Sequence, residues 1–256
     1  MILVKLGGSV ITDKGRYRTF DPDTAGRLAE EIARTGQDVV IVHGAGSFGH
    51  ILAKEHRLHL GISDGSQLLG ASLVMSDVRE LDLEVCRRLS AKGVRAVPLP
   101  PASCAAMRDG TLHHLDLDLF KAYLHLGMVP VTFGDVVRDE VRGLSICSGD
   151  QLMAALAKEF RPNKVIFVTD VDGVFTADPT QDPKARLIET VDQKVLDSLP
   201  RTERNVDVTG SIFAKIRYMI GMASLTNECL VLNGKVPGRL EAAIRGERVI
   251  ASRVVS

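Results

Sequence analysis

The stretch His43-Gly44-Ala45-Gly46-Ser47-Phe48-Gly49-His50 separates the apolar run at residues 39–42 from a helical pattern. Such an apolar run is typical of a buried parallel strand. A glycine-rich turn between a strand and a helix exposes backbone N–H groups, and the helix N-terminus adds partial positive charge. The stretch therefore predicts an anion site, with His50 close enough to touch the anion. Glycines at such a turn can also serve tight packing alone.

Composition limits the class of protein. The chain has 256 residues with 32 basic and 32 acidic side chains, so its formal net charge is zero. A neutral chain argues against nucleic-acid binding by bulk electrostatics and against a polybasic membrane surface. No apolar run approaches transmembrane length, and Met1 leads directly into a short strand pattern. We expect a cytoplasmic protein that binds neither nucleic acid nor membrane.

Cysteine and histidine usage gives no metal or disulfide signature. The four cysteines (Cys86, Cys104, Cys147 and Cys229) are scattered without a C-x-x-C pair, which fits reduced thiols. The adjacent pair His113-His114 is interpreted as part of a solvated loop. We therefore expect no metal ligand among the side chains.

Short β-rich runs alternate with longer helical patterns along the whole chain. Strands are predicted at residues 2–5, 38–43, 94–99, 128–133, 164–169, 229–232 and 248–251. Helices are predicted at residues 23–34, 47–55, 65–90, 116–125, 150–159, 191–198, 211–223 and 238–244. This alternation indicates an α/β fold with an open, mainly parallel sheet covered by helices on both faces. We expect one domain over residues 1–256, with lobes of about 1–160 and 161–256 that meet near a soft boundary at residues 161–163.

Five short glycine-containing segments, called glycine stations below, occur at residues 5–9, 44–47, 148–150, 170–173 and 209–211. In an open parallel sheet, strand ends of one sense line the edge where ligands bind. Stations in both halves of the chain predict a long anionic ligand or two ligands that meet. No station matches the P-loop or the dinucleotide-binding pattern.

Lysines accompany these stations. Lys5 ends an apolar strand, Lys14 follows the first station, and Lys215 lies one turn into the helix after the last. Lysines that converge on glycine stations suit phosphoryl transfer, whose transition state is stabilised by charge and positioning. Lys5 could instead reach solvent. Asp150 could cap a helix or orient the lysines, and Asp170 and Asp172 could simply form a turn.

These stations, in this order, resemble the amino acid kinase family. Within that family, residues 8–14 and 43–50 are similar to the isopentenyl phosphate kinases. The resemblance implies an αβα three-layer sandwich, usually a homodimer, with the acceptor in the N-lobe and the nucleotide in the C-lobe. It also implies transfer of phosphate from ATP to isopentenyl phosphate, with Mg²⁺ held by phosphate oxygens and water.

The resemblance also implies roles for individual residues. The catalytic set would be Lys5, Lys14, His50, Asp150 and Lys215. The nucleotide would contact Lys5, Gly7, Gly8, Ser9, Asp170, Asp172, Gly173, Phe175, Asp178, Gly210 and Lys215. The acceptor would contact Ala45, Gly46, Gly49, His50, Ile146, Ser148 and Gly149. His50 would donate a hydrogen bond to the acceptor phosphate.

An alkenyl acceptor also needs an apolar pocket. Its candidate residues are Leu73, Val74, Met75, Val78, Val136 and Ile146, although core packing is the more ordinary role of each. A fosfomycin-kinase-like enzyme of the same fold is the nearest alternative. Glutamate, acetylglutamate and UMP kinases fit less well because they give His50 no purpose. A nucleotide-binding regulator is the alternative outside enzymes.

Overall fold

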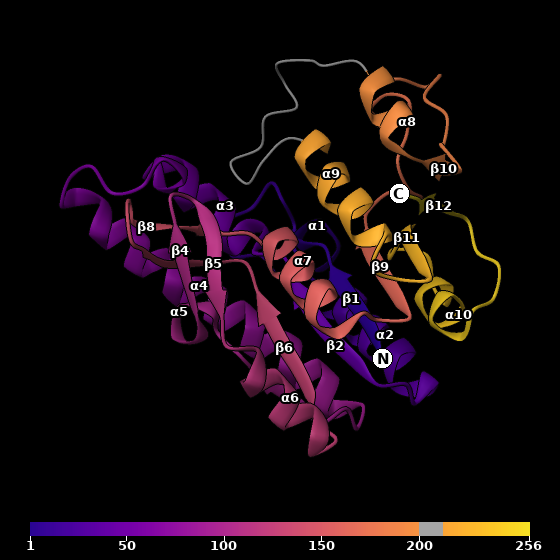
Figure 1. Cartoon of the computed structure of the whole chain (residues 1–256), viewed down its shortest axis with the longest axis horizontal. Coiled ribbons are helices and arrows are strands. Elements are labelled where there is room, and N and C mark those ends of the chain that lie inside the picture. The colour runs from indigo at the N-terminus through magenta and orange to yellow at the C-terminus, as the bar shows by residue number, and fades with distance from the viewer. Residues whose placement is uncertain (200–211) are drawn as a thin grey trace.

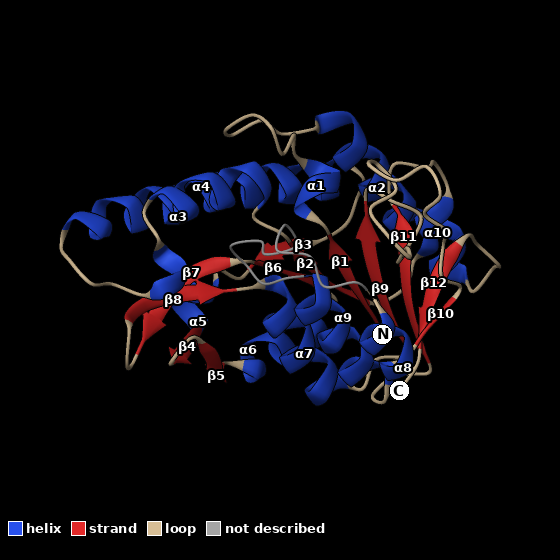
Figure 2. Cartoon of the chain, turned by 90° about the horizontal axis from the view of Figure 1, so that it is seen from above, coloured by secondary structure: helices blue, strands red, loops and turns tan. Residues whose placement is uncertain are grey.

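The computed structural model describes residues 1–199 and 212–256, and their arrangement is the predicted α/β sandwich (Figures 1 and 2). The main sheet of the described residues has eight strands in the order β10-β12-β11-β9-β1-β2-β6-β3. Its strands are β1 (Ile2–Leu6), β2 (Val39–His43), β3 (Ala96–Pro98), β6 (Val129–Phe133), β9 (Lys164–Thr169), β10 (Thr190–Val191), β11 (Glu228–Asn233) and β12 (Ala251–Val254). Within it, β12 runs antiparallel to β11, and the strands from β11 to β3 pair in parallel.

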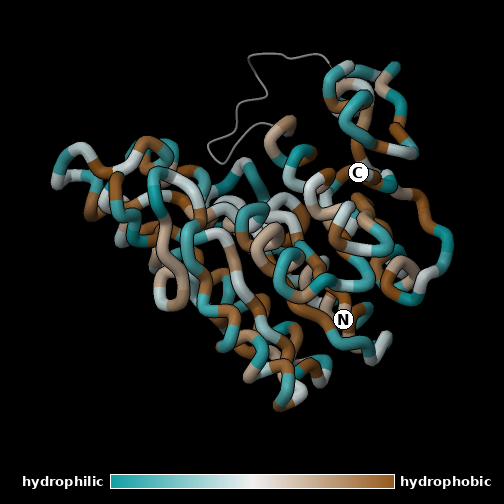
Figure 3. The backbone as a smooth tube through the Cα atoms, in the orientation of Figure 1, coloured by the Kyte–Doolittle hydropathy of each residue, from teal (hydrophilic) through white to brown (hydrophobic). Residues whose placement is uncertain are grey.

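Helices cover both faces of this sheet (Figure 2). One layer contains α1 (Gly8–Ile11), α2 (Pro22–Thr35), α3 (Gly46–Glu55), α4 (Ser66–Ala91) and α10 (Arg239–Arg245). The other contains α6 (Leu117–His125), α7 (Gly149–Phe160), α8 (Gln193–Ser198) and α9 (Ile212–Ala223). In Figure 3 the central strands are mainly hydrophobic, whereas the helices alternate between hydrophobic and hydrophilic residues. This pattern is what a sheet buried on both faces requires.

The alternation along β1 assigns each side chain to one layer. Ile2, Val4 and Leu6 pack into the core beside α2, α4 and α10, whereas Leu3 packs into the core beside α7 and α9. Successive side chains of a strand point to opposite faces of the sheet. Lys5 therefore shares the face of Leu3 and points toward α7.

A second sheet, not predicted from the sequence, lies at one end of the molecule (Figure 1). Its strands β4 (Ala105–Arg108), β5 (Thr111–Leu115), β7 (Asp135–Asp139) and β8 (Gly143–Cys147) are arranged in the order β5-β4-β7-β8 beside α5 (Pro101–Cys104). His113 and His114, expected in a loop, are exposed residues of β5. These strands are short and partly polar, so they lack the apolar runs that revealed the main sheet.

Element ends differ from the prediction in a few places. The last strand is β12 at Ala251–Val254, three residues beyond the predicted start, and β3 is shorter than the run at 94–99. Helix α7 is capped by Ser148, whose side chain accepts a hydrogen bond from the N–H of Gln151, so Asp150 is not the cap. Among the described residues, no helix combines the length and the apolar character needed to span a membrane.

Candidate active site

A cavity of about 1000 Å³ opens at the edge where β1, β2 and β9 end. It brings together residues from both halves of the chain that the sequence singled out separately. Those that line it are Lys5, Gly7, Gly8, Ser9, Lys14, Ala45, Gly46, Gly49, His50, Ile146, Ser148, Gly149, Asp150, Asp170, Gly173, Phe175, Asp178 and Lys215. The four glycine stations among the described residues, at 5–9, 44–47, 148–150 and 170–173, thus contribute to one cavity.

Two expected residues stand apart from this set. Asp172 does not line the cavity, because its carboxylate is 2.5 Å from Nη1 of Arg239 and accepts a hydrogen bond from Asn233 at 3.1 Å. Gly210 lies outside the described residues. Asp172 therefore ties β9 to the segment around α10 instead of facing a ligand.

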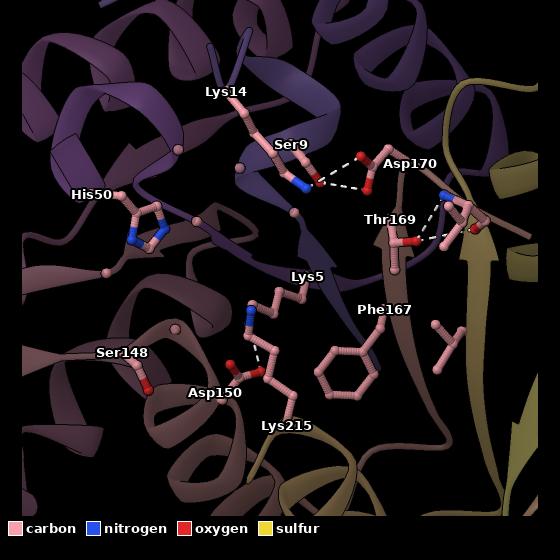
Figure 4. A pocket seen from close by; sticks show the side chains of 18 of the residues that line it. Lys5, Ser9, Lys14, His50, Ser148, Asp150, Phe167, Thr169, Asp170 and Lys215 are labelled. Atoms are coloured by element: carbon pink, nitrogen blue, oxygen red, sulfur yellow. Dashed lines mark hydrogen bonds and ion pairs between the residues drawn. The ribbon is translucent and has the colours of Figure 1, made fainter. Parts of the chain in front are cut away.

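Lys5 and Asp150 form a buried ion pair at the base of the cavity (Figure 4). The Nζ of Lys5 lies 2.5 Å from Oδ1 of Asp150, and also 5.9 Å from the centre of the Phe167 ring. Burial lowers the pKa of Lys5, the carboxylate of Asp150 raises it, and the nearby charge of Lys215 lowers it, with a net lowering. The alternative in which Lys5 escapes to solvent is wrong, and Asp150 faces a lysine.

Two glycine turns touch each other at the cavity wall. A Cβ built on Gly8 would lie 2.5 Å from the backbone nitrogen of Gly46, and one on Gly44 would lie 2.6 Å from that of Gly8. Gly46 also has a φ of 51°, in the left-handed region that favours glycine. The helices α3 and α7 begin at Gly46 and Gly149, so two helix N-termini line one cavity. This arrangement suits phosphate groups.

Asp170 connects the two sides of the cavity (Figure 4). The hydroxyl of Ser9 donates to its Oδ1 at 2.8 Å, and Nζ of Lys14 lies 3.3 Å from its Oδ2. Ser9 and Lys14 follow β1, whereas Asp170 follows β9. The carboxylate thus holds both N-terminal groups at the cavity rim.

His50 and His43 occupy different environments at the two ends of the opening motif. His50 is in α3 and faces the cavity in Figure 4. His43 is fully buried, with Nε2 at 3.2 Å from Oδ1 of Asp82 and its ring stacked on Phe133. His43 therefore belongs to the core behind the glycine turn.

One part of the cavity is apolar. Val74 of α4, Val136 of β7 and Ile146 of β8 line it, and Val136 and Ile146 are opposite each other in the register of the two strands. These three side chains pack in one cluster with Ala45 of the glycine turn. Three other candidate pocket residues do not line the cavity. Leu73 is exposed, whereas Met75 and Val78 pack in the same apolar cluster without reaching the cavity, so that of these α4 residues only Val74 lines it.

Several lining residues escaped the sequence analysis. Phe167 on β9 lines the same face as Lys5, and a period of two along that strand could have indicated it. Asp135 is buried beside Arg79, with its carboxylate 3.2 Å from Nη2; burial raises its pKa and Arg79 opposes that shift. Residues 176–182 form a further wall, of which the resemblance had already indicated Asp178.

Known proteins share both the sequence and this architecture. The profile of the amino acid kinase family matches residues 1–233. The isopentenyl phosphate kinase of Methanothermobacter thermautotrophicus is 41% identical, covering 99% of this chain and 98% of that protein. The enzyme of that name from Thermoplasma acidophilum is 36% identical over 94% of each chain. A solved isopentenyl phosphate kinase structure superimposes with a TM-score of 0.87 at 37% identity, covering 99% of both chains.

Proposed function

This chain belongs to the amino acid kinase family, and we propose that it transfers the γ-phosphoryl group of ATP to isopentenyl phosphate, giving isopentenyl diphosphate and ADP. Full-length relatives of that name support the proposal, as does a solved relative described as a substrate complex, with a TM-score of 0.84 at 32% identity. The observation that carries it is a single cavity in which glycine turns and lysines adjoin an apolar end. That combination fits a phosphate with a short hydrocarbon tail.

We place the acceptor in the N-lobe. His50 and the turn of Ala45, Gly46 and Gly49 would hold its phosphate, with Ser148 and Gly149 on the opposite wall. Its tail would lie against Val74, Val136 and Ile146. A monophosphate is already a nucleophile, so the site needs neutralisation and in-line approach rather than a strong base.

We place the nucleotide on the other side of the cavity. Gly7, Gly8 and Ser9 would approach the β- and γ-phosphates, while Gly173, Phe175 and Asp178 would border the nucleoside. Lys5, Lys14 and Lys215 would neutralise charge that develops as the phosphoryl group moves, and Asp150 would orient Lys5. A phosphate oxygen of the acceptor attacks the γ-phosphorus, and ADP leaves with the electrons of the broken bond.

We propose that Mg²⁺ enters with ATP, bound by phosphate oxygens and water. Within residues 1–199 and 212–256, no group of three or more His, Cys, Asp or Glu side chains is placed to hold a metal ion. Asp170, a carboxylate at the cavity rim, already accepts hydrogen bonds from Ser9 and Lys14. Magnesium would screen phosphate charge beside the lysines.

A homodimer in the cytoplasm completes the proposal. Leu69, Leu73 and Leu83 are all exposed and lie along one stripe of α4, a surface that a second copy could cover. The four cysteines are buried and unbridged, as the reducing cytoplasm favours. Sedimentation velocity tests the dimer. We expect the wild type to sediment as a dimer and the double variant Leu69→Glu/Leu73→Glu to sediment as a monomer.

A coupled assay of ADP release tests the activity. It compares isopentenyl phosphate, dimethylallyl phosphate, fosfomycin, UMP and glutamate at equal concentration with Mg²⁺ and ATP. The proposal predicts the highest kcat/KM with isopentenyl phosphate. A clear preference for fosfomycin would assign the chain to that alternative activity, and ATP binding without turnover of any acceptor would favour a regulator.

A further inference from the structure

The segment that carries Lys14 is a loop closed at its base. The N–H of Asp13 donates to the carbonyl of Thr19 at 2.9 Å, and Thr12 and Phe20 form an antiparallel bridge. The side chain of Lys14 is 66% exposed, and its Nζ lies 3.3 Å from Oδ2 of Asp170. Residues 14–18 thus span the loop between two fixed ends.

The far side of this loop is attached to a buried carboxylate on α4. The hydroxyl of Tyr17 donates to Oδ2 of Asp77 at 2.5 Å, and Nε of Arg18 lies 3.5 Å from Oδ1 of the same residue. Asp77 is 4% exposed, whereas Glu80, the other residue of α4 that pairs with Arg18, is exposed. A carboxylate this buried requires such partners.

The backbone at Arg18 shows why the attachment is needed. Arg18 has a φ of 51°, in the left-handed region that a non-glycine residue rarely adopts. Its N–H donates to the carbonyl of Ser47 at 3.4 Å, so the same residue also contacts the glycine turn of α3. The strained conformation persists only where surrounding contacts hold it.

We infer that Asp77 is a positioning residue for the phosphoryl-transfer reaction, which holds the Lys14 loop against α4 so that the ammonium reaches the transferring phosphate. The inference rests on the proposed function. With Tyr17 and Arg18 attached to α4, the far end of the loop is fixed, and residues 14–16 follow a turn in which Asp13 accepts from the N–H groups of Gly15 and Arg16. Less conformational freedom is therefore lost when Lys14 engages the phosphate. Asp77 does not line the cavity and acts only through this loop.

The first test needs no enzymatic activity. Trypsin cleaves after Lys14, Arg16 and Arg18, so its rate at these bonds reports how well the loop is held. We expect Asp77→Asn to be cleaved there about tenfold faster than the wild type, because a held loop is cut from its transiently open form. Glu80→Gln is the matched control: it pairs with the same Arg18 but is exposed, and its cleavage rate should stay near that of the wild type.

The second test is a double-mutant cycle with Lys14→Met. We expect Asp77→Asn to lower kcat about tenfold and to change KM for either substrate about twofold at most, and to have no further effect once Lys14 is Met. Tyr17→Phe removes only the hydroxyl that donates to Asp77 and keeps the aromatic ring, so it should fold normally. It is expected to lower kcat about threefold in the wild type and not in Lys14→Met.

The outcomes separate the inference from the function. If the wild type releases ADP with another acceptor of the screen but not with isopentenyl phosphate, the proposed function is wrong. The double-mutant cycle is then run with the acceptor that reacts. Equal trypsin rates in Asp77→Asn, Tyr17→Phe and wild type overturn the inference. So does a loss of kcat that persists in the Lys14→Met background, since Asp77 would then act on the fold in general.

Discussion

The ammonium of Lys5 and the carboxylate of Asp150 are 145 residues apart in the chain and 2.5 Å apart in space. Both side chains are largely buried, with 14% and 5% exposed. An isolated buried ammonium tends to lose its proton, whereas an adjacent carboxylate keeps it charged. The pair therefore keeps a cation at the base of a cavity that we propose to bind phosphates.

Removing the carboxylate tests this relationship through pH. Burial already lowers the pKa of Lys5, and Asp150 is the group that raises it. In Asp150→Asn the pKa of Lys5 should fall further, so Lys5 should lose its proton at a lower pH than in the wild type. We expect kcat to drop and the alkaline limb of the kcat profile to shift toward neutral pH.

A pH profile of Asp150→Asn beside Asp118→Asn provides the comparison. Asp118 is on α6 with an exposed side chain and should leave the profile unchanged. An alkaline limb at the same pH in wild type and Asp150→Asn would show that Asp150 does not sustain the charge of Lys5.

His50→Ala is expected to weaken acceptor binding. Losing one hydrogen bond to a charged group costs on the order of 1.5–3 kcal/mol, which corresponds to a loss of roughly 10- to 150-fold in kcat/KM for the acceptor. His114→Ala, at an exposed position of β5, is the control. Steady-state kinetics with isopentenyl phosphate measure both; activity within a few-fold of wild type in His50→Ala would remove His50 from the acceptor site.

Gly8→Ala is expected to force the two glycine turns apart. The new Cβ would meet the backbone of Gly46 at 2.5 Å, and backbone cannot rotate away as a side chain can. We expect a loss of stability of roughly 1–3 kcal/mol, as in other overpacked sites, together with a lower kcat. Thermal unfolding and ADP release measure the two effects.

Gly26→Ala provides the opposite control for that substitution. Gly26 is inside α2, and its added Cβ would meet nothing within 4 Å. Alanine in a helix interior stabilises by roughly 0.5–1 kcal/mol relative to glycine, so the melting temperature should rise with activity unchanged. A Gly8→Ala variant that melts like wild type would refute the close-approach argument.

Shortening the apolar end should admit a longer hydrocarbon chain. Val74→Ala, Val136→Ala and Ile146→Ala each remove methyl or methylene groups from the cavity wall, and each buried methylene of substrate is worth about 0.8 kcal/mol. We expect at least one variant to raise the ratio of kcat/KM for geranyl phosphate over isopentenyl phosphate. Leu68→Ala, at an exposed position of α4 outside the proposed dimer stripe, should leave the ratio unchanged. A constant ratio in all three variants would place the tail elsewhere.

The main sheet could be predicted because its strands are short apolar runs between helical patterns. The predicted strands at 38–43, 128–133 and 164–169 appear as β2, β6 and β9 with nearly the same ends. The second sheet could not be predicted, since β5 and β7 mix charged or histidine residues into runs of five. Such short, mixed strands are fixed by their neighbours in the sheet rather than by their own composition.

The sequence by itself determined the chemistry available: glycine turns after strands, lysines beside them, and a histidine at a helix start. Those signals are local, because backbone turns and strand ends depend on neighbouring residues. Only the tertiary structure decided which groups meet. It joined Lys5 to Asp150, turned Asp172 away to Arg239, and chose Val74 over Leu73 for the cavity. Those choices depend on strand order and helix rotation, which follow from packing the whole chain.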